Sequence, residues 1–280
     1  MLEHRPIALV TGVGRRAGIG AALAERLATD GWDLALSWWG PYDERVHGAA
    51  DPDGVDAVVE RCTSAGARVA RLPVDLADAD QASGIVGRAS AALDGPVSAL
   101  VMSHCESVDS DFATTSVAAF DRHIAVNARA PFLMIQAYAA ALRTAAHDTT
   151  AAADTGAGPR DTAAAPRADH HPRRIIALTS DHTVRNLPYG TSKGALDRLV
   201  IAAATELGDL DVRANVLNPG PIDTGWMDDA VRASGIASTP AGRLGTPSDI
   251  AAYVAFLCSP EGGWINGQLL FADGGFSAKG

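Results

Sequence analysis

Short apolar runs alternate along the chain with longer segments of helical periodicity. Short runs bounded by turn residues predict buried strands, and apolar residues at every third or fourth position predict amphipathic helices. The runs that predict strands are 7–10, 33–38, 68–74, 96–102, 174–180, 212–217 and 268–271. The helical segments are 21–28, 53–65, 79–93, 117–143, 228–238, and the stretches that follow Tyr189 and Gly245.

This alternation predicts the fold class. Strands that alternate with helices pair in parallel, and the crossover helices cover both faces of the sheet. We therefore predict an α/β protein with a single doubly wound Rossmann-type domain over residues 1–280, built on a mostly parallel seven-stranded sheet. The pattern shows neither an internal repeat nor a second domain.

Two segments depart from the alternation. Within 117–143, Pro131 has no N–H, so the carbonyl of Asn127 loses its helical partner; we expect a bend there and an acceptor that could hold a water. Residues 147–172 are poor in large apolar side chains and predict a flexible insertion at the edge of the sheet opposite the ligand-binding edge. We expect His147, His170 and His171 to belong to this solvated segment rather than to a metal site.

Composition narrows the classes of function. The net charge is −10 and no basic stripe is visible, which argues against binding to nucleic acid. Cys62, Cys105 and Cys258 lie far apart without a CxxC or Cys/His cluster, so we predict neither a disulfide framework nor a metal centre. The chain begins without a cleavable signal and has no membrane-spanning stretch, which predicts a cytoplasmic protein with no membrane contact.

A glycine-rich loop joins the first strand to the first helix. Its sequence is TGVGRRAGIG over residues 11–20. Glycines let the backbone approach a ligand closely, and a helix N-terminus offers N–H groups to a pyrophosphate. The alternative is a turn that happens to be rich in glycine. We predict a phosphate-binding loop that includes Thr11, Gly12, Gly14, Gly18, Ile19 and Gly20.

Residues near the second and third strands bear on the choice of cofactor. An acid at the end of the second strand commonly holds the ribose of NAD, but this strand ends in Trp38 without one. Arg15 and Arg16 would suit a 2′-phosphate, so NADP(H) is favoured over NAD(H), although both could simply be exposed. Asp75, with Leu76 after it, could bind adenine or cap the next helix, with Asp78 as the rival cap.

Tyr189 and Lys193 are the strongest candidates for chemistry. A spacing of four residues at the start of a helix puts both side chains on one face, one turn apart. A free tyrosine has a pKa of about 10, and a nearby cation lowers it. The pair is therefore a plausible proton-transfer device, and the alternative is a solvated helix face.

The whole chain resembles the short-chain dehydrogenase/reductase family, and most closely its 3-oxoacyl-[acyl-carrier-protein] reductase-like branch. The resemblance rests on motifs in a fixed order along the chain. They are TG…GIG (11–20), Asp75-Leu76, Asn127, Ser180, Tyr189, Lys193, NPGPIDT (218–224), GRLGTPSDIA (242–251), FLCS (256–259) and INGQLLFADGG (265–275).

The resemblance implies a reaction and roles for the residues. Tyr189 would be the general acid in reduction of a ketone or the base in oxidation of an alcohol, and Lys193 would lower its pKa and hold the nicotinamide ribose. Ser180 would bind the substrate oxygen, and Asn127 would hold a water that links Lys193 to solvent. Ile222 and Thr224 match positions that hold the nicotinamide carboxamide, and Pro219 and Gly220 form a turn that fits a ligand wall. The family also implies a homotetramer or homodimer and a small carbonyl or alcohol substrate.

Three departures from the family pattern are visible. The glycine loop has two extra residues, and the family's NNAG is replaced by residues 102–105, MSHC. This replacement removes two amides that brace the strand; Ser103 could supply one hydrogen bond, and His104 either approaches the cofactor or packs. The interval from Ser180 to Tyr189 is shorter than usual, so either the loop is shortened or Ser180 is imperfectly placed. Thr179 is a weaker substitute because it points to the other face.

Two functions follow from these observations. The first is an NADP(H)-dependent reductase of ketones, with 3-oxoacyl compounds among the candidate substrates, that can also catalyse the reverse reaction. The second is a catalytically weak sensor or scaffold that binds the cofactor, and the altered 102–105 stretch and the short loop motivate it.

Overall fold

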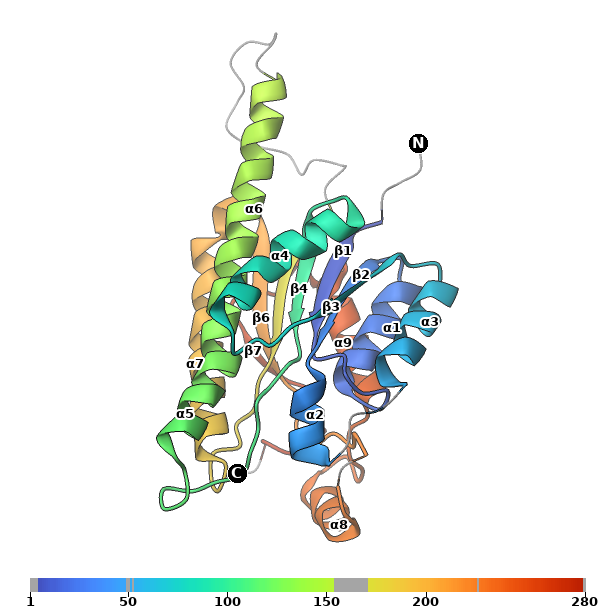
Figure 1. The fold of residues 1–280 in the computed structure, drawn as a ribbon. Helices are drawn as coiled ribbons and strands as arrows, with labels where there is room; N and C mark the ends of the chain where they lie inside the picture. Colours follow the sequence, from blue (N-terminus) through green and yellow to red (C-terminus); the bar gives the residue numbers. More distant parts are fainter. Residues whose placement is uncertain (1–4, 49–50, 52, 154–170, 226, 279–280) are drawn as a thin grey trace.

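The computed structural model describes residues 5–48, 51, 53–153, 171–225 and 227–278 (Figure 1). Its centre is a seven-stranded sheet in the order β3-β2-β1-β4-β5-β6-β7, with every neighbouring pair parallel. The predicted fold is confirmed. The strands are β1 (Ile7–Thr11), β2 (Asp33–Trp38), β3 (Val69–Pro73), β4 (Val97–Met102), β5 (Arg173–Leu178), β6 (Val212–Asn218) and β7 (Leu269–Phe271).

Helices cover both faces of the sheet (Figure 1). The helices are α1 (Ile19–Thr29), α2 (Gly40–His47), α3 (Gly54–Ser64), α4 (Ala79–Leu93), α5 (Val117–Ile124), α6 (Ala130–Ala153), α7 (Leu187–Glu206), α8 (Asp229–Ser238) and α9 (Pro247–Cys258). Helices α1, α3 and α9 share one hydrophobic cluster with one face, and α4, α6 and α7 share a second cluster with the other. The central strands are buried on both faces, which explains their nearly continuous apolar sequence.

The strand order changes direction at β1, which lies between β2 and β4. In such sheets the crossovers on the two sides of this point leave in opposite directions, and a crevice opens at the carboxyl ends of the strands. The loops that follow β1, β2, β4, β5 and β6 meet at this edge. The fold therefore gathers the sequence motifs that lie directly after these strands.

The predicted bend near Asn127 is a π-helical turn, η1 (Ala125–Arg129), between α5 and α6. Such a turn shifts the hydrogen bonds by one residue, which accommodates a proline such as Pro131. Helix α6 continues to Ala153, beyond the predicted end at residue 143. The start of the predicted insertion, residues 147–153, is thus helical, in keeping with the high helix propensity of its alanines. Residues 154–170 lie outside the described residues.

Helix α2 was not predicted, because glycine and proline punctuate the segment after Trp38. Pro41 stands in the first turn, where its missing N–H costs nothing, and Gly48 ends the helix with a φ of 78°. Two predicted caps are present. Asp78, rather than Asp75, caps α4 through the N–H groups of Asp80 and Gln81, and Thr246 forms a capping box on α9.

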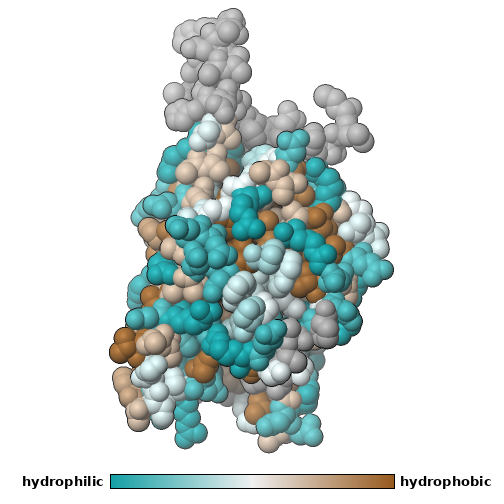
Figure 2. Space-filling view, viewed as in Figure 1, coloured by the Kyte–Doolittle hydropathy of each residue, from teal (hydrophilic) through white to brown (hydrophobic). Residues whose placement is uncertain are grey.

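The face seen in Figure 2 is mostly hydrophilic, with an apolar patch over α5. Phe112 and Val117, before and at the start of α5, are strongly exposed. Over the part of the chain that the structure describes, no helix is long and apolar enough to cross a membrane, and no group of three or more His, Cys, Asp or Glu side chains could hold a metal ion.

Candidate active site

A large cleft runs along the carboxyl edge of the sheet. It encloses about 1480 Å³, more than the roughly 300–1,000 Å³ typical of a pocket for one small ligand, so a dinucleotide and a substrate can fit together. Most of the predicted site residues line it. They are Gly12, Gly14, Arg15, Gly18, Ile19, Gly20, Trp38, Asp75, Leu76, Ser103, Ser180, Tyr189, Lys193, Pro219, Gly220, Ile222 and Thr224. Thr11, Arg16 and Asn127 lie outside this lining.

The glycine loop packs directly against its surroundings. A Cβ on Gly12, whose φ is +79°, would lie 2.8 Å from the backbone nitrogen of His104, and a Cβ on Gly20 would overlap the carbonyl oxygen of Gly12. Gly18 is the N-cap of α1 and has no side chain to satisfy the first N–H groups of the helix. The loop is thus a cradle of backbone donors at a helix N-terminus, which is the arrangement that binds phosphate.

Both loop arginines have protein partners in the structure. Arg15 Nη2 donates to the carbonyl of Thr224 at 2.5 Å, which ties the glycine loop to the loop after β6. Arg16 pairs with Asp51 at 3.0 Å, and the pair raises the pKa of Arg16. Sequence reasoning also missed Asp43 on α2, a buried acid whose carboxylate lies against Gly14. This end of the cleft thus contains charges of both signs.

Asp75 and Trp38 occupy the walls of this end of the cleft. Asp75 accepts a hydrogen bond from the N–H of Ala77 at 2.9 Å and lies 3.5 Å from a guanidinium nitrogen of Arg122. Its neighbour Leu76 is buried in the core. The guanidinium of Arg71 lies 5.9 Å from the centre of a Trp38 ring. Asp75 is not the helix cap, so adenine binding remains the open prediction for it.

His104 braces the floor of the cleft, within the stretch that replaces the family's NNAG. Its Nε2 lies 3.1 Å from the carbonyl of Val126, which can only accept, so Nε2 carries the proton. Nδ1 therefore accepts from the Thr11 hydroxyl at 2.6 Å, and Thr11 Oγ1 in turn accepts from the N–H of Ser103. Burial, with Lys193 nearby, lowers the pKa of His104 to about 3. A neutral imidazole thus joins β1, β4 and the π-helical turn.

Ser180 reaches Tyr189 despite the short interval between them. The loop 181–186 leads directly into α7, which begins two residues before Tyr189. The Ser180 side chain hydrogen-bonds the Tyr189 phenol and also accepts the N–H of His182 at 3.1 Å. Thr179 is buried and bonds Lys193 O instead, as expected for the opposite face. The loop is therefore shortened and Ser180 is well placed.

The pKa of Tyr189 is raised, whereas the sequence predicted that Lys193 would lower it. Burial raises it above the ordinary value, with the nearby Cys105 thiol adding to the rise and the Ser180 hydrogen bond opposing it. Lys193 is buried and its Nζ lies 5.7 Å from the Tyr189 ring centre, donating instead to the carbonyls of Leu178 at 2.8 Å and His104 at 3.4 Å. Burial lowers the pKa of Lys193. The phenol is thus held in its protonated form, as a proton donor requires.

Asn127 serves as a clamp between the stretch after β4 and helix α7. Its Oδ1 accepts from the N–H of Glu106 at 2.8 Å, and its Nδ2 donates to the carbonyl of Glu106 at 2.8 Å and to Ser192 Oγ at 2.9 Å. Ser192 Oγ donates to the carbonyl of Tyr189 at 2.8 Å. With its side chain engaged in this way, only the backbone carbonyl of Asn127 is left for the predicted water, which stays a prediction.

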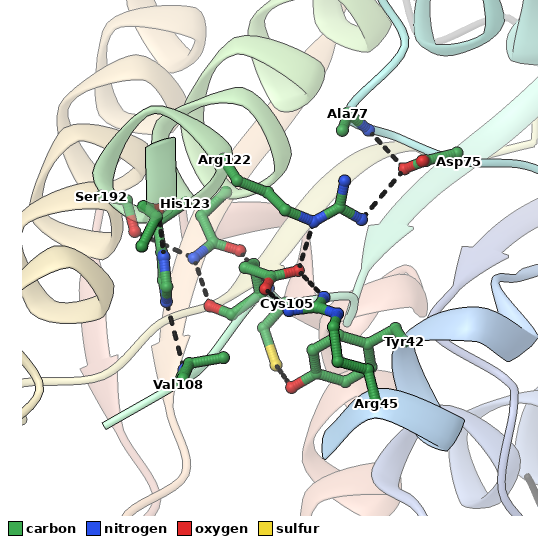
Figure 3. Close-up of polar contacts among 12 residues, drawn as sticks. Tyr42, Arg45, Asp75, Ala77, Cys105, Val108, Arg122, His123 and Ser192 are labelled. Atoms are coloured by element: carbon green, nitrogen blue, oxygen red, sulfur yellow. Dashed lines mark hydrogen bonds and ion pairs between the residues drawn. The ribbon is translucent and has the colours of Figure 1, made fainter. Parts of the chain in front are cut away.

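Helix α2 brings side chains into the cleft that sequence reasoning missed (Figure 3). The Tyr42 hydroxyl lies 3.9 Å from Cys105 Sγ, and burial raises the pKa of Tyr42. Arg45 forms an ion pair with Glu106 at 2.7 Å. The only sequence signal for Glu106 was its place four residues after the end of β4, because its partners lie far away in the chain.

The loop after β6 forms the opposite wall. Gly220 has a φ of +64° and packs against Asp273, while Ile222 pairs with Gly245 and is buried. Thr224 receives the bond from Arg15 described above. The positions that the family resemblance assigned to the nicotinamide end therefore face the glycine loop across the cleft.

Fold and site together define a nucleotide-binding oxidoreductase of the Rossmann type with a Ser-Tyr-Lys constellation. The family model described as "short chain dehydrogenase" matches residues 6–149, and one described as "Enoyl-(Acyl carrier protein) reductase" matches residues 161–277. The chain belongs to the short-chain dehydrogenase/reductase family.

Individual proteins agree with this membership. The chain is 29% identical over 98% of its length to the uncharacterized oxidoreductase YjdA of Bacillus subtilis, of which it covers 98%. It is 29% identical to an NADPH-dependent aldehyde reductase-like chloroplastic protein of Arabidopsis thaliana, over 96% of this chain and 93% of that one. Among solved structures, a blue fluorescent protein from a metagenomic library in complex with NADPH has a TM-score of 0.76 and 30% identity, over 97% of this chain and 98% of that one.

Proposed function

We propose that this chain is an NADP(H)-dependent oxidoreductase that reduces a ketone, with 3-oxoacyl compounds among the candidate substrates, to a secondary alcohol, or catalyses the reverse. The observation that carries the proposal is the hydrogen bond between Ser180 and the protonated Tyr189 phenol, beside the buried Lys193 and in one cleft with the glycine loop. The resident cofactor supplies the hydride. The residues of the chain supply position, a proton and exclusion of water.

The cleft suits a dinucleotide. The cradle at the N-terminus of α1 leaves no room for a Cβ at Gly12 or Gly20, which brings backbone donors within reach of a pyrophosphate. Ile222 and Thr224 would contact the nicotinamide end, and Lys193 the ribose beside it. NADP(H) is favoured because Arg16 stands in the glycine loop with its side chain half exposed, and because two similar proteins carry NADPH in their names.

The proton chemistry follows from two hydroxyl groups. Ser180 would donate to the carbonyl oxygen of the substrate, and Tyr189 would give it a proton as the carbinol forms. Lys193 would then replenish Tyr189 with a proton from solvent. In the reverse direction Tyr189 would accept the proton of the alcohol.

The scaffold alternative rested on two departures from the family pattern. His104, in the stretch that replaces the family's NNAG, bridges Thr11 and Val126, and Ser180 bonds Tyr189 across the short loop. These contacts supply the bracing and the placement that the departures put in doubt. They favour the enzyme over the scaffold.

The test is a turnover assay of the purified protein with NADPH and, separately, NADH over a panel of aldehydes, ketones and 3-oxoacyl thioesters. We expect oxidation of NADPH with at least one carbonyl substrate and weaker activity with NADH. Tight cofactor binding without turnover on any substrate would instead establish the scaffold. Measurement of the mass in solution tests the predicted homotetramer or homodimer, for which the exposed Phe132 of α6 and Ile201 of α7 are compatible contact residues.

A further inference from the structure

Glu106 is a buried carboxylate at the junction of three elements. Its side chain is 2% exposed and accepts from Arg45 of α2 at 2.7 Å and 2.8 Å, through both carboxylate oxygens. Its Oε2 also accepts from Arg122 Nε of α5 at 3.1 Å. A bidentate arginine with a second arginine on the same carboxylate fixes both the position and the plane of that group.

The backbone of the same residue holds the Asn127 clamp. Glu106 N–H and Glu106 C=O both bond the side-chain amide of Asn127, at 2.8 Å each. The amide then bonds Ser192, which bonds the carbonyl of Tyr189. A continuous set of contacts thus runs from the ion pairs of Glu106 to the first turn of α7, where the phenol is placed.

We propose that Glu106 is a positioning residue: its ion pairs with Arg45 and Arg122 fix the backbone that holds Asn127 and, through Ser192, the turn that carries Tyr189. The inference rests on the proposed function of Tyr189. Glu106 touches neither the phenol nor Lys193 through any hydrogen bond or ion pair of the described residues, so its effect reaches them through Asn127. Small displacements of a reacting group lower the rate more than they lower substrate binding.

The chain contains a matched control for this proposal. Asp33, at the amino end of β2, is also a buried carboxylate held by two arginines, Arg68 at 2.6 Å and Arg5 at 3.7 Å. It lies at the edge of the sheet opposite the cleft. Glu106→Gln and Asp33→Asn therefore remove the same kind of charge from the same kind of surroundings, and only one of them stands next to the clamp.

The experiment compares kcat, KM and thermal unfolding of these two variants with the wild type. Both variants should lower the unfolding temperature, because each removes a buried carboxylate charge that pairs with two arginines. Glu106→Gln should also lower kcat about tenfold with KM changed by less than about threefold, whereas Asp33→Asn should leave kcat unchanged. Equal kcat values for Glu106→Gln and Asp33→Asn would overturn the proposal.

Arg45→Gln covers the case in which Glu106→Gln does not fold. Arg45 is half exposed, so its loss should be tolerated, and kcat should fall in the same direction but by less. The double variant Glu106→Gln/Arg45→Gln should be no slower than Glu106→Gln, because both substitutions act on one contact. If the two substitutions lowered kcat additively, Glu106 and Arg45 would not act through the same ion pair, which would contradict the proposal.

A spectroscopic readout separates this proposal from the proposed function. The side-chain amide signal of Asn127 in an NMR spectrum, assigned from its loss in Asn127→Asp, should shift and broaden in Glu106→Gln and stay in place in Asp33→Asn. An unmoved signal in Glu106→Gln would overturn the positioning role even if the enzyme is active. If the wild type reduces no carbonyl compound, the proposed function fails, and this signal still decides whether Glu106 positions Asn127.

Discussion

The hydroxyl of Ser180 hydrogen-bonds the phenol of Tyr189, although only the loop 181–186 and the first two residues of α7 separate Ser180 from it. Ser180 follows β5 at the carboxyl edge of the sheet, and Tyr189 stands in the first turns of a helix that starts at the same edge. This geometry places two hydroxyl donors side by side in the cleft, so both can reach one carbonyl oxygen.

Loss of the Ser180 hydroxyl should therefore slow the reaction without disturbing the fold. We expect Ser180→Ala to lower kcat about a hundredfold, since it removes one preorganised hydrogen-bond donor to the developing oxyanion. Ser180→Thr keeps a hydroxyl and should retain more activity than Ser180→Ala. Steady-state kinetics with the best carbonyl substrate measure this, and equal kcat values for Ser180→Ala and the wild type would remove Ser180 from the mechanism.

The proposed preference for NADP(H) rests on Arg16 and its partner Asp51. Arg16→Ala should weaken binding of NADPH about tenfold and leave NADH unaffected, because only NADPH carries the 2′-phosphate. Asp51→Asn removes the carboxylate that holds Arg16 and should strengthen binding of NADPH. Titrations followed by tryptophan fluorescence measure both dissociation constants. An equal change for the two cofactors in Arg16→Ala would rule out this arginine as the phosphate ligand.

The glycine cradle should tolerate no side chain at Gly20. A Cβ there meets the carbonyl oxygen of Gly12, so Gly20→Ala must displace the loop and should abolish cofactor binding. Gly87, on α4, has no atom within 4 Å of its would-be Cβ and serves as the control. Gly87→Ala should stabilise the protein by about 0.5–1 kcal/mol and leave binding unchanged. Normal cofactor affinity in Gly20→Ala would contradict the cradle.

His104 should make the protein sensitive to acid. The pKa of His104 is about 3 in the folded state, below the 6.5 of an unperturbed histidine. Between these pH values the imidazole is therefore protonated in the unfolded state and neutral in the folded state. Stability should therefore fall as the pH drops from 6.5 towards 3, by up to about 1.4 kcal/mol per pH unit from this group. Above pH 6.5 the His104 side chain is neutral in both the folded and the unfolded state, so it no longer makes stability depend on pH.

Denaturant unfolding at several pH values tests this. His104→Asn should be less stable than the wild type near pH 7, and the difference between the two should shrink as the pH falls below 6.5. The exposed His182 provides the control, because His182→Asn should keep the pH dependence of the wild type. A constant difference between His104→Asn and the wild type over this range would refute a neutral His104.

The sequence was sufficient to predict the strands of the sheet and the candidate site residues that follow them. Apolar runs and helical periodicity depend on local spacing, so β1 to β7 and caps such as Thr246 were predictable. Pro131 predicted the irregular turn at Asn127, since its missing N–H removes a hydrogen bond to a residue only four positions earlier. Parallel strands end at one edge, which brought Ser180, Tyr189 and the glycine loop together.

Contacts between distant segments were not predictable. Helix α2 lies in a stretch of turn residues, and its packing on the cleft decides its structure. The pairing of Arg45 with Glu106 joins positions 61 residues apart, and the bridge from Thr11 to His104 joins positions 93 apart. The raised pKa of Tyr189 also depends on burial, which the spacing to Lys193 does not reveal.

The most direct test of the central claim, that Tyr189 gives the proton to the substrate, is kcat of Tyr189→Phe. Tyr253→Phe is the matched control, because Tyr253 is partly buried and packs against the core cluster on the α1/α9 side of the sheet. We predict that Tyr189→Phe lowers kcat by at least about a hundredfold, as expected for loss of a general acid, while Tyr253→Phe stays near the wild type. Turnover by Tyr189→Phe at the wild-type rate would contradict the account.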